Sequence, residues 1–367
     1  MAQLDGLRAI AVLAVFADHW LPGAYRLGVA WGESGVDLFF VLSGFLITGI
    51  LLTCRRYVDE AGQSVLTTAK QFYIRRTLRI WPLYFGVLLL YMVAAQDPTN
   101  WLSPWLWTFT LNFYRTFVEP TWGGPMSHFW SLAVEEQFYL VWPWVILLTP
   151  RRYLLPVLIG AVLIGPLTKI MMALVGYHER AIRFFTLSCL DTLAFGGLLA
   201  YFSHLAGVER IANSRVVAWL GPLSLLLLGA GLVLRLNSEA PLERMALFMS
   251  AKTLFLGWIV IKAAHGFRGA VGFVLSARPV MYIGKISFGL YLLSKPLAAL
   301  VERMGLPVED IHPLVVFSLY SALSVGAATL SWNYFEAPIN RLKRHFPYHV
   351  DSTARKPSVD TASQSIR

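Results

Sequence analysis

An arginine and a histidine lie eleven residues apart in the first apolar stretch of the chain, Leu7–Trp20. Eleven steps of ~100° along an α-helix return His19 to within ~20° of the face that carries Arg8, ~16 Å further along the axis. Ionisable side chains in a lipid-spanning helix are costly and usually mark a site or a path. We therefore predict that Arg8 and His19 act near opposite ends of one buried helix.

Carboxylates on two other apolar segments are expected to reach the depth of His19. Asp37 lies in GVDLFFVLSGFLITGILL, and Glu135 and Glu136 lie in HFWSLAVEEQFYLVWPW. An imidazole that titrates near neutral pH can take a proton from an alcohol when an acidic partner fixes its tautomer. The pattern predicts His19 as a general base, oriented or charge-balanced by Glu135 and by Asp37.

A run of arginines precedes the third apolar segment, in the sequence FYIRRTLRIWP. Arg76 and Arg79 are three residues apart, so on a helix they share a face. The planar fork of a guanidinium favours bidentate contacts with phosphate. The run therefore predicts a phosphate-binding face beside the membrane. A topology signal or a contact with anionic lipids is the alternative interpretation.

Composition indicates an all-α, polytopic membrane protein. Of the 367 residues 56% are hydrophobic and 14% are charged, whereas a soluble domain has about 25% charged residues. The net charge of +10 lies mainly in two blocks beside apolar segments, where sorting of basic loops to the cytoplasm explains it. No nucleic-acid partner is therefore expected. Cys54 and Cys189 lie in or beside apolar segments, so a disulfide framework is not expected either.

The apolar segments predict a membrane bundle of about ten transmembrane helices. The basic clusters between the segments all fall on one side of the membrane if both termini are cytoplasmic, which fixes the expected orientation. The predicted spans are residues 7–21, 36–53, 81–95, 128–148, 154–175, 186–203, 216–234, 247–264, 280–300 and 313–334.

Residues 101–122 are apolar and aromatic enough to form one more span. Counting them as a span would place Arg151 and Arg152 outside and invert everything that follows. We therefore expect a re-entrant or interfacial segment on the outer side. Residues 1–345 are expected to form one integral-membrane domain, and the polar residues 346–367 a disordered cytoplasmic tail.

Several other polar residues have structural interpretations. His128 is interpreted as a span-start residue at the water boundary, and Asp18 as a polar residue at a helix end. Asp191 and Arg183 are expected to form a structural pair near the sixth span.

A series of motifs resembles, in order, the acyltransferase-3 family of bacterial membrane proteins, which O-acylate glycans. The motifs spread over residues 1–345 and close with YFEAPINR, which is similar to the family's final Glu-x-Pro. The preceding motifs are LDGLRAIAVLAVFADHW, GVDLFFVLSGFLIT, FYIRRTLRIWPLYF, HFWSLAVEEQFYLVWP, LDTLAFGGLLA and YIGKISFGLYLLSKP.

The resemblance implies a multi-pass O-acetyltransferase of the bacterial cytoplasmic (inner) membrane. It would take an acyl group, usually acetyl from acetyl-coenzyme A, and deliver it to a hydroxyl of a lipid-linked or nascent surface saccharide, such as a lipopolysaccharide or exopolysaccharide. His19 would be the catalytic imidazole and Glu135 the membrane carboxylate. The phosphates of the coenzyme would be bound by Arg8, Arg75, Arg76 and Arg79.

The saccharide is expected to contact the second and fourth spans, through Ser43, Trp130 and Glu136. No bound metal is expected, and membrane lipids surround the domain. Many relatives carry a second histidine in a late span, where this chain has Ser294. No hydrolase-like domain follows the membrane part, so we expect a stand-alone member, and any periplasmic partner domain would be a separate protein.

Two other classes of protein remain as alternatives. In a transporter or flippase the charged groups would form a permeation path, although no internal repeat is visible in the sequence. In a sensory or scaffolding protein they would only hold helices together. Within the acyltransferase hypothesis, succinyl is an alternative to acetyl. Transfer through an acylated His19 is likewise an alternative to direct transfer with His19 as the base.

Overall fold

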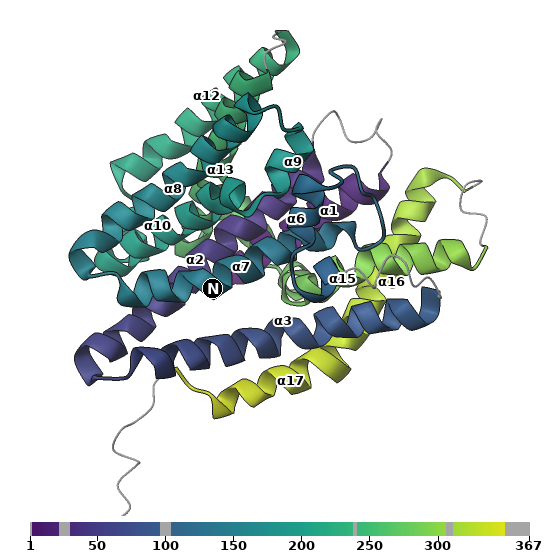
Figure 1. The fold of residues 1–367 in the computed structure, drawn as a ribbon, viewed down its shortest axis with the longest axis horizontal. Coiled ribbons are helices and arrows are strands. Elements are labelled where there is room, and N and C mark those ends of the chain that lie inside the picture. Colours follow the sequence, from purple (N-terminus) through teal and green to yellow (C-terminus); the bar gives the residue numbers. More distant parts are fainter. Residues whose placement is uncertain (1, 22–29, 96–103, 238–240, 306–310, 349–367) are drawn as a thin grey trace, which may run out of the picture.

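The computed structural model describes residues 2–21, 30–95, 104–237, 241–305 and 311–348 (Figure 1). Within these ranges every regular element is helical and no β-strand occurs, which confirms the all-α prediction. A long helix covers each predicted span: α1 (Ala2–Trp20), α2 (Trp31–Ala61), α3 (Val65–Ala95), α7 (Trp130–Leu148), α8 (Arg151–Leu174), α10 (Leu190–Ala206), α12 (Arg215–Asn237), α13 (Pro241–His265), α15 (Arg278–Arg303) and α16 (Pro313–Ser331).

Among the described residues, fewer helices than the predicted ten meet the length and hydropathy that a membrane crossing requires. Five helices in the described ranges are long and apolar enough to cross a membrane. A sixth crossing results if Phe248–His265 and Gly269–Leu275, which meet at 83°, form one broken span. Helix α1 is not among them, since its 19 residues include the charged Asp5, Arg8 and Asp18. The count of ten therefore remains unconfirmed.

Short helices connect or extend the long ones. They are α5 (Pro104–Trp107), α6 (Leu111–Phe117), the 3-10 turn η2 (Ser127–Phe129), α9 (Glu179–Phe184), η3 (Thr186–Cys189), α11 (Val208–Ala212), α14 (Gly269–Leu275), the π-helical turn η5 (Trp332–Glu336), α17 (Ala337–Arg341) and η6 (Leu342–His345).

The segment that was predicted to be re-entrant or interfacial contains only short helices. In its described part, helices α5 and α6 have four and seven residues. At ~1.5 Å per residue neither can cross a hydrocarbon core of ~30 Å. This agrees with the expectation that residues 101–122 add no crossing, while residues 101–103 lie outside the described residues.

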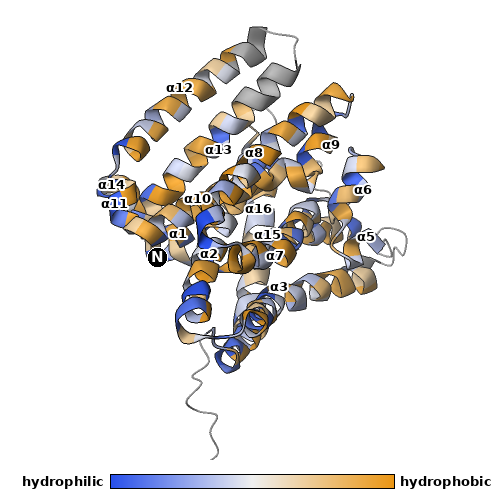
Figure 2. Ribbon diagram, turned by 60° about the vertical axis from the view of Figure 1, so that its left-hand side comes forward, coloured by the Kyte–Doolittle hydropathy of each residue, from blue (hydrophilic) through white to orange (hydrophobic). Residues whose placement is uncertain are grey.

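Helices α1, α2, α7 and α15 form the centre of the bundle. Helix α1 packs against α2 and α15, while α2 packs against α10 and α7. In Figure 1, helices α8, α10, α12 and α13 lie together on one side of this centre, and α3 and α16 flank it elsewhere. Large apolar residues cover the outer helices, as the colouring of α12 in Figure 2 shows; Val216 and Trp219 are more than 70% exposed. Such a surface suits a multi-pass membrane protein.

Glycine allows α2 and α10 to pack closely against each other. A Cβ on Gly44 of α2 would lie 1.8 Å from the carbonyl oxygen of Leu193 in α10, and one on Gly196 of α10 would lie 2.1 Å from that of Val41. Small residues of this kind let helix backbones approach each other in membrane proteins. The position of α2 against α10 therefore depends on both glycines.

The end of the described chain packs against the start of α3. Arg75 donates hydrogen bonds to the carbonyls of Lys343 and Phe346, and its guanidinium lies 4.5 Å from the ring centre of Tyr348. Residues 346–348 are thus held by the domain. The rest of the predicted disordered tail, residues 349–367, lies outside the described residues.

We expect Gly44→Ala to destabilise the bundle by about 1–3 kcal/mol, because its methyl group must displace the backbone of α10. Thermal unfolding in detergent measures the effect. Gly49→Ala on the same helix is the matched control, since nothing lies within 4 Å of its added Cβ. Equal melting temperatures for the two variants would contradict the assigned contact.

Candidate active site

A cavity of about 130 Å³ lies among five helices at the centre of the bundle, namely α1, α2, α3, α7 and α15. Its charged lining consists of Arg8, Arg76, Arg79 and Glu135. Hydroxyl groups complete the polar lining, from Ser43, Ser131, Tyr139, Ser287 and Tyr291. The cavity therefore joins five predicted site residues that the sequence separates widely: Arg8, Ser43, Arg76, Arg79 and Glu135.

The three arginines of the cavity differ in how they are paired. Arg8 forms an ion pair with Asp5, at 2.6 Å. Arg79 lies 3.5 Å from Glu336, and its guanidinium faces the ring of Trp332. Arg76 lies against the rings of Phe72 and Tyr139 and forms no ion pair within the described ranges. Its charge is therefore the one that is most available to an anionic ligand.

Arg75 points away from this cavity. It holds the end of the described chain through two backbone carbonyls, as described above. The reason is helical geometry, since adjacent residues on a helix point ~100° apart. The predicted grouping of Arg75 with the other three arginines is thus not seen in the structure.

Glu135 connects α7 with α2. One of its oxygens accepts a hydrogen bond from Ser43 at 2.8 Å, and the other accepts one from the hydroxyl of Tyr139 at 3.2 Å. Neither oxygen is bonded to His19. The structure therefore places Glu135 in the arginine-lined cavity rather than in contact with the imidazole.

Trp130 and Glu136 lie outside the cavity. Trp130 is buried in the core between Phe40 and Phe184. Glu136 accepts a hydrogen bond from the indole of Trp81, at 2.9 Å. The structure therefore does not bring these two predicted substrate contacts together with Ser43.

Asp37 belongs to a separate cluster of buried charges. It lies 3.1 Å from Arg183 of α9 and 2.7 Å from Lys252 of α13. The expected pair of Asp191 with Arg183 is wrong, because Asp191 instead bonds Lys169 at 2.6 Å. Both lysines are less than 10% exposed, and a buried lysine in an apolar span needs a carboxylate partner. The position of Lys169 and Lys252 in apolar segments of the sequence could therefore have predicted that each has a carboxylate partner.

His19 lies at the far end of α1, as predicted, and its neighbour is a second imidazole. The ring centres of His19 and His128 are 6.1 Å apart, and His128 is only 4% exposed. The interpretation of His128 as a residue at the water boundary is therefore wrong. The buried Nδ1 of His19 has no hydrogen-bond partner in the part of the chain that the structure describes. Lys295 of α15 is close enough to act electrostatically on both imidazoles.

The cavity ends against the turn that carries His128. Ser131 and Tyr291, which line the cavity, share a hydrogen bond of 2.6 Å. The hydroxyl of Tyr291 donates to the carbonyl of His128, and the rings of these two residues are 5.1 Å apart. The arginine-lined cavity and the pair of imidazoles are thus separated by one layer of side chains.

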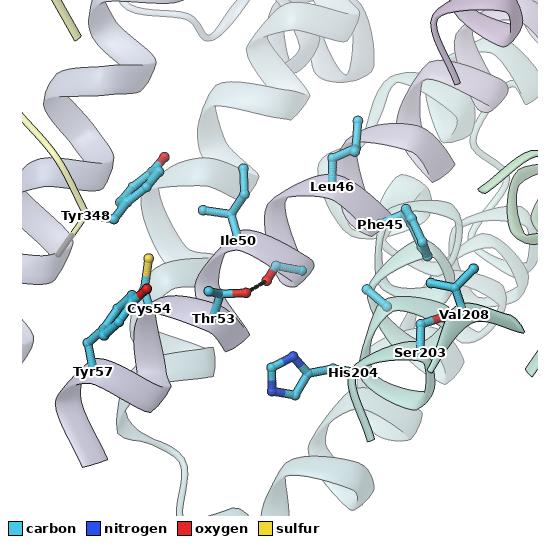
Figure 3. Close-up of a pocket in the computed structure, with 12 residues that line it drawn as sticks. Phe45, Leu46, Ile50, Thr53, Cys54, Tyr57, Ser203, His204, Val208 and Tyr348 are labelled. Carbon is cyan, nitrogen blue, oxygen red and sulfur yellow. Dashed lines mark hydrogen bonds between the residues drawn. The ribbon is translucent and has the colours of Figure 1, made fainter. Parts of the chain in front are cut away.

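A second cavity lies between α2 and α10 and is mainly apolar (Figure 3). Phe45, Leu46 and Ile50 line it, together with the imidazole of His204. It contains none of the predicted site residues, and the hydroxyl of Thr53 in its wall is bonded to the carbonyl of Gly49.

Comparison with known proteins identifies a family. The acyltransferase-3 model, described as an acyltransferase domain, matches residues 1–333. The peptidoglycan O-acetyltransferase OatA of Listeria monocytogenes is 30% identical over 372 residues, covering 92% of this chain and 56% of the relative. A putative O-acetyltransferase of Staphylococcus aureus strain MSSA476 is 30% identical over 379 residues, covering 93% and 57%.

The O-acetyltransferase OatA of Staphylococcus aureus strain NCTC 8325 is 26% identical over 370 residues, covering 92% of this chain and 57% of the relative. The chain thus spans just over half the length of these curated relatives. No solved structure matches the chain.

We expect Asp37→Asn to destabilise the protein by about 3–5 kcal/mol, because it leaves the buried charges of Arg183 and Lys252 without their carboxylate. Thermal unfolding in detergent measures this. Asp59→Asn, which removes a more exposed partner of Arg55 and Arg151, is the control and should change stability by less than about 1 kcal/mol. Unchanged stability with lost activity would instead support the predicted role of Asp37 beside His19.

Proposed function

The chain belongs to the acyltransferase-3 family, and from this membership we propose that it is an O-acetyltransferase of the bacterial cytoplasmic membrane. It takes acetyl from acetyl-coenzyme A and delivers it to a saccharide hydroxyl. The observation that supports this best is the cavity that joins Arg8, Arg76 and Arg79 and ends against Tyr291, whose ring contacts His128 beside His19. A transporter is not favoured, because the family is one of group transfer.

The donor is proposed to bind at the arginine-lined cavity. Coenzyme A carries several phosphates, and guanidinium groups bind phosphate through paired hydrogen bonds. Arg76 is the proposed main contact, since it has no ion pair among the described residues. Glu135 lies close enough to Arg76 to act on it electrostatically, so we assign it to the donor side as a counter-charge.

His19 is proposed to act on the acceptor. It accepts the proton of the attacking hydroxyl, and the oxygen then forms a bond with the acetyl carbon while the thiolate of coenzyme A leaves. In the alternative route the imidazole itself is acetylated first and then passes the group on. Because α1 is one unbroken helix, Arg8 and His19 are held ~16 Å apart along its axis.

The acceptor is proposed to be a lipid-linked or nascent surface saccharide. The relative from Listeria monocytogenes is named a peptidoglycan O-acetyltransferase, which supports a cell-surface glycan as the substrate class. A separate periplasmic protein is a proposed partner of the reaction.

We expect His19→Ala to lower acetyl transfer at least 100-fold, because the hydroxyl loses its proton acceptor. Transfer is measured as radiolabel moving from acetyl-coenzyme A into glycan in membranes of the producing cells. His204→Ala, in the second cavity, is the matched control and should transfer at the normal rate. Normal transfer by a folded His19→Ala variant would remove this residue from the mechanism.

We expect Arg76→Gln to weaken binding of coenzyme A about tenfold or more, and Arg76→Gln/Arg79→Gln to weaken it further. Isothermal titration of the purified protein measures the dissociation constant. Arg152→Gln is the control, since its guanidinium lies against Tyr153 and outside the cavity. Equal affinity in the double variant and the control would exclude the arginine-lined cavity as the donor site.

A further inference from the structure

Side chains from three helices hold the backbone of the turn η2 (Ser127–Phe129). Arg115 of α6 donates to the carbonyl of Ser127 at 3.1 Å. From α15, Lys295 donates to the hydroxyl of Ser127 and Tyr291 donates to the carbonyl of His128, each at 2.8 Å. The hydroxyl of Ser131 in α7 lies 3.2 Å from the same carbonyl and 2.6 Å from the hydroxyl of Tyr291, so it donates to one of the two. The position of the main chain at His128 is thus fixed from several sides.

The side chain of His128 lacks the hydrogen bonds that its backbone forms. Its ring is buried, and neither ring nitrogen meets hydrogen-bond geometry with a described residue, although the backbone of Tyr291 and Leu292 lies close to it. A neutral imidazole carries one N–H donor and one acceptor nitrogen. Buried polar groups are normally bonded, so a fixed turn that leaves both nitrogens unbonded requires an explanation. The adjacent His19 has a buried, unbonded nitrogen as well.

Lys295 brings a positive charge to the same place. Its ammonium is fixed on Ser127, next to His128, and it forms no ion pair in the ranges described. The neighbouring Ser294 does not supply a hydrogen-bond donor here, because its hydroxyl donates to the carbonyl of Tyr291 in its own helix. The site beside His19 therefore offers two possible donors, the ring N–H of His128 and the ammonium of Lys295.

We propose that His128 and Lys295 form the oxyanion site of the acyl transfer, and this assignment rests on the proposed function. The attacking hydroxyl gives its proton to His19, and its oxygen bonds the acyl carbon. The electron pair of the C=O double bond moves onto the carbonyl oxygen, where the ring N–H of His128 and the ammonium of Lys295 stabilise the negative charge. When the double bond re-forms, the C–S bond breaks, and the thiolate takes the proton back from His19. Donors fixed in advance at a developing charge, in a site that excludes water, are an effective form of catalysis.

The experiment measures kcat and the KM for acetyl-coenzyme A in membranes of the producing cells, which contain their own glycan acceptor. We expect Lys295→Met and His128→Gln each to lower kcat about 100-fold to 1,000-fold. The KM and the binding of coenzyme A should stay within about twofold of the unmodified protein, which also shows that the variants are folded. Lys295→Arg, which keeps the charge, should recover at least about tenfold over Lys295→Met.

Two controls separate oxyanion stabilisation from a structural role. Ser127→Ala removes the hydroxyl that holds Lys295 but leaves both donors, and we expect less than fivefold loss of kcat. Lys262→Met removes a lysine that bonds the carbonyl of Ala212, and should leave transfer unchanged.

The proposal is overturned if Lys295→Met and His128→Gln keep normal kcat, if Ser127→Ala is as damaging as Lys295→Met, or if the loss appears in KM alone. If the unmodified protein transfers no acetyl group, the proposed function itself is wrong. If the unmodified protein is active and the variants match it, only the assignment of the oxyanion site fails.

Discussion

Charge buried among apolar helices is the constraint on which this structure depends. An ionised group inside such a bundle must find a partner on another element, because unpaired burial costs several kcal/mol. Asp37 therefore joins α2 to α9 and α13, and Lys169 joins α8 to α10 through Asp191. These pairs lie in the part of the bundle formed by α2, α8, α9, α10 and α13. The charges of the central cavity, in contrast, are only partly paired, which is typical of groups kept for a ligand.

Most of the fold could be predicted from the sequence. Ten apolar segments became ten helices, and the shared face of Arg76 and Arg79 opens on one cavity with Arg8, because helical periodicity is a local property. The orientation inferred from the basic loops stays a prediction, and the number of crossings is unconfirmed. The charged residues of α1 lower its hydropathy although α1 is at the centre of the bundle.

The partners of each charge could be predicted less well. Depth along a span follows from residue number, but the direction in which a side chain points depends on how helices rotate against each other. Asp37 and His19 were expected at similar depth, and yet Asp37 faces Arg183 and Lys252. His128 was assigned to the water boundary because it begins a span, whereas the short turn η2 folds it inward beside His19. No role was predicted for Lys295, because the contact of α15 with the turn η2 does not follow from the sequence.

The contacts at the start of α3 have a further consequence for the proposed donor site. Arg75 is bonded to the carbonyls of residues 343 and 346, while its neighbour Arg76 lies against two aromatic rings at the cavity. These contacts, on different faces of one helical turn, limit rotation of α3 about its axis. The guanidinium of Arg76 is therefore ordered before any ligand arrives. At the proposed donor site, a phosphate would therefore bind without the entropic cost of ordering a mobile arginine side chain, so preorganisation of this helix would favour binding.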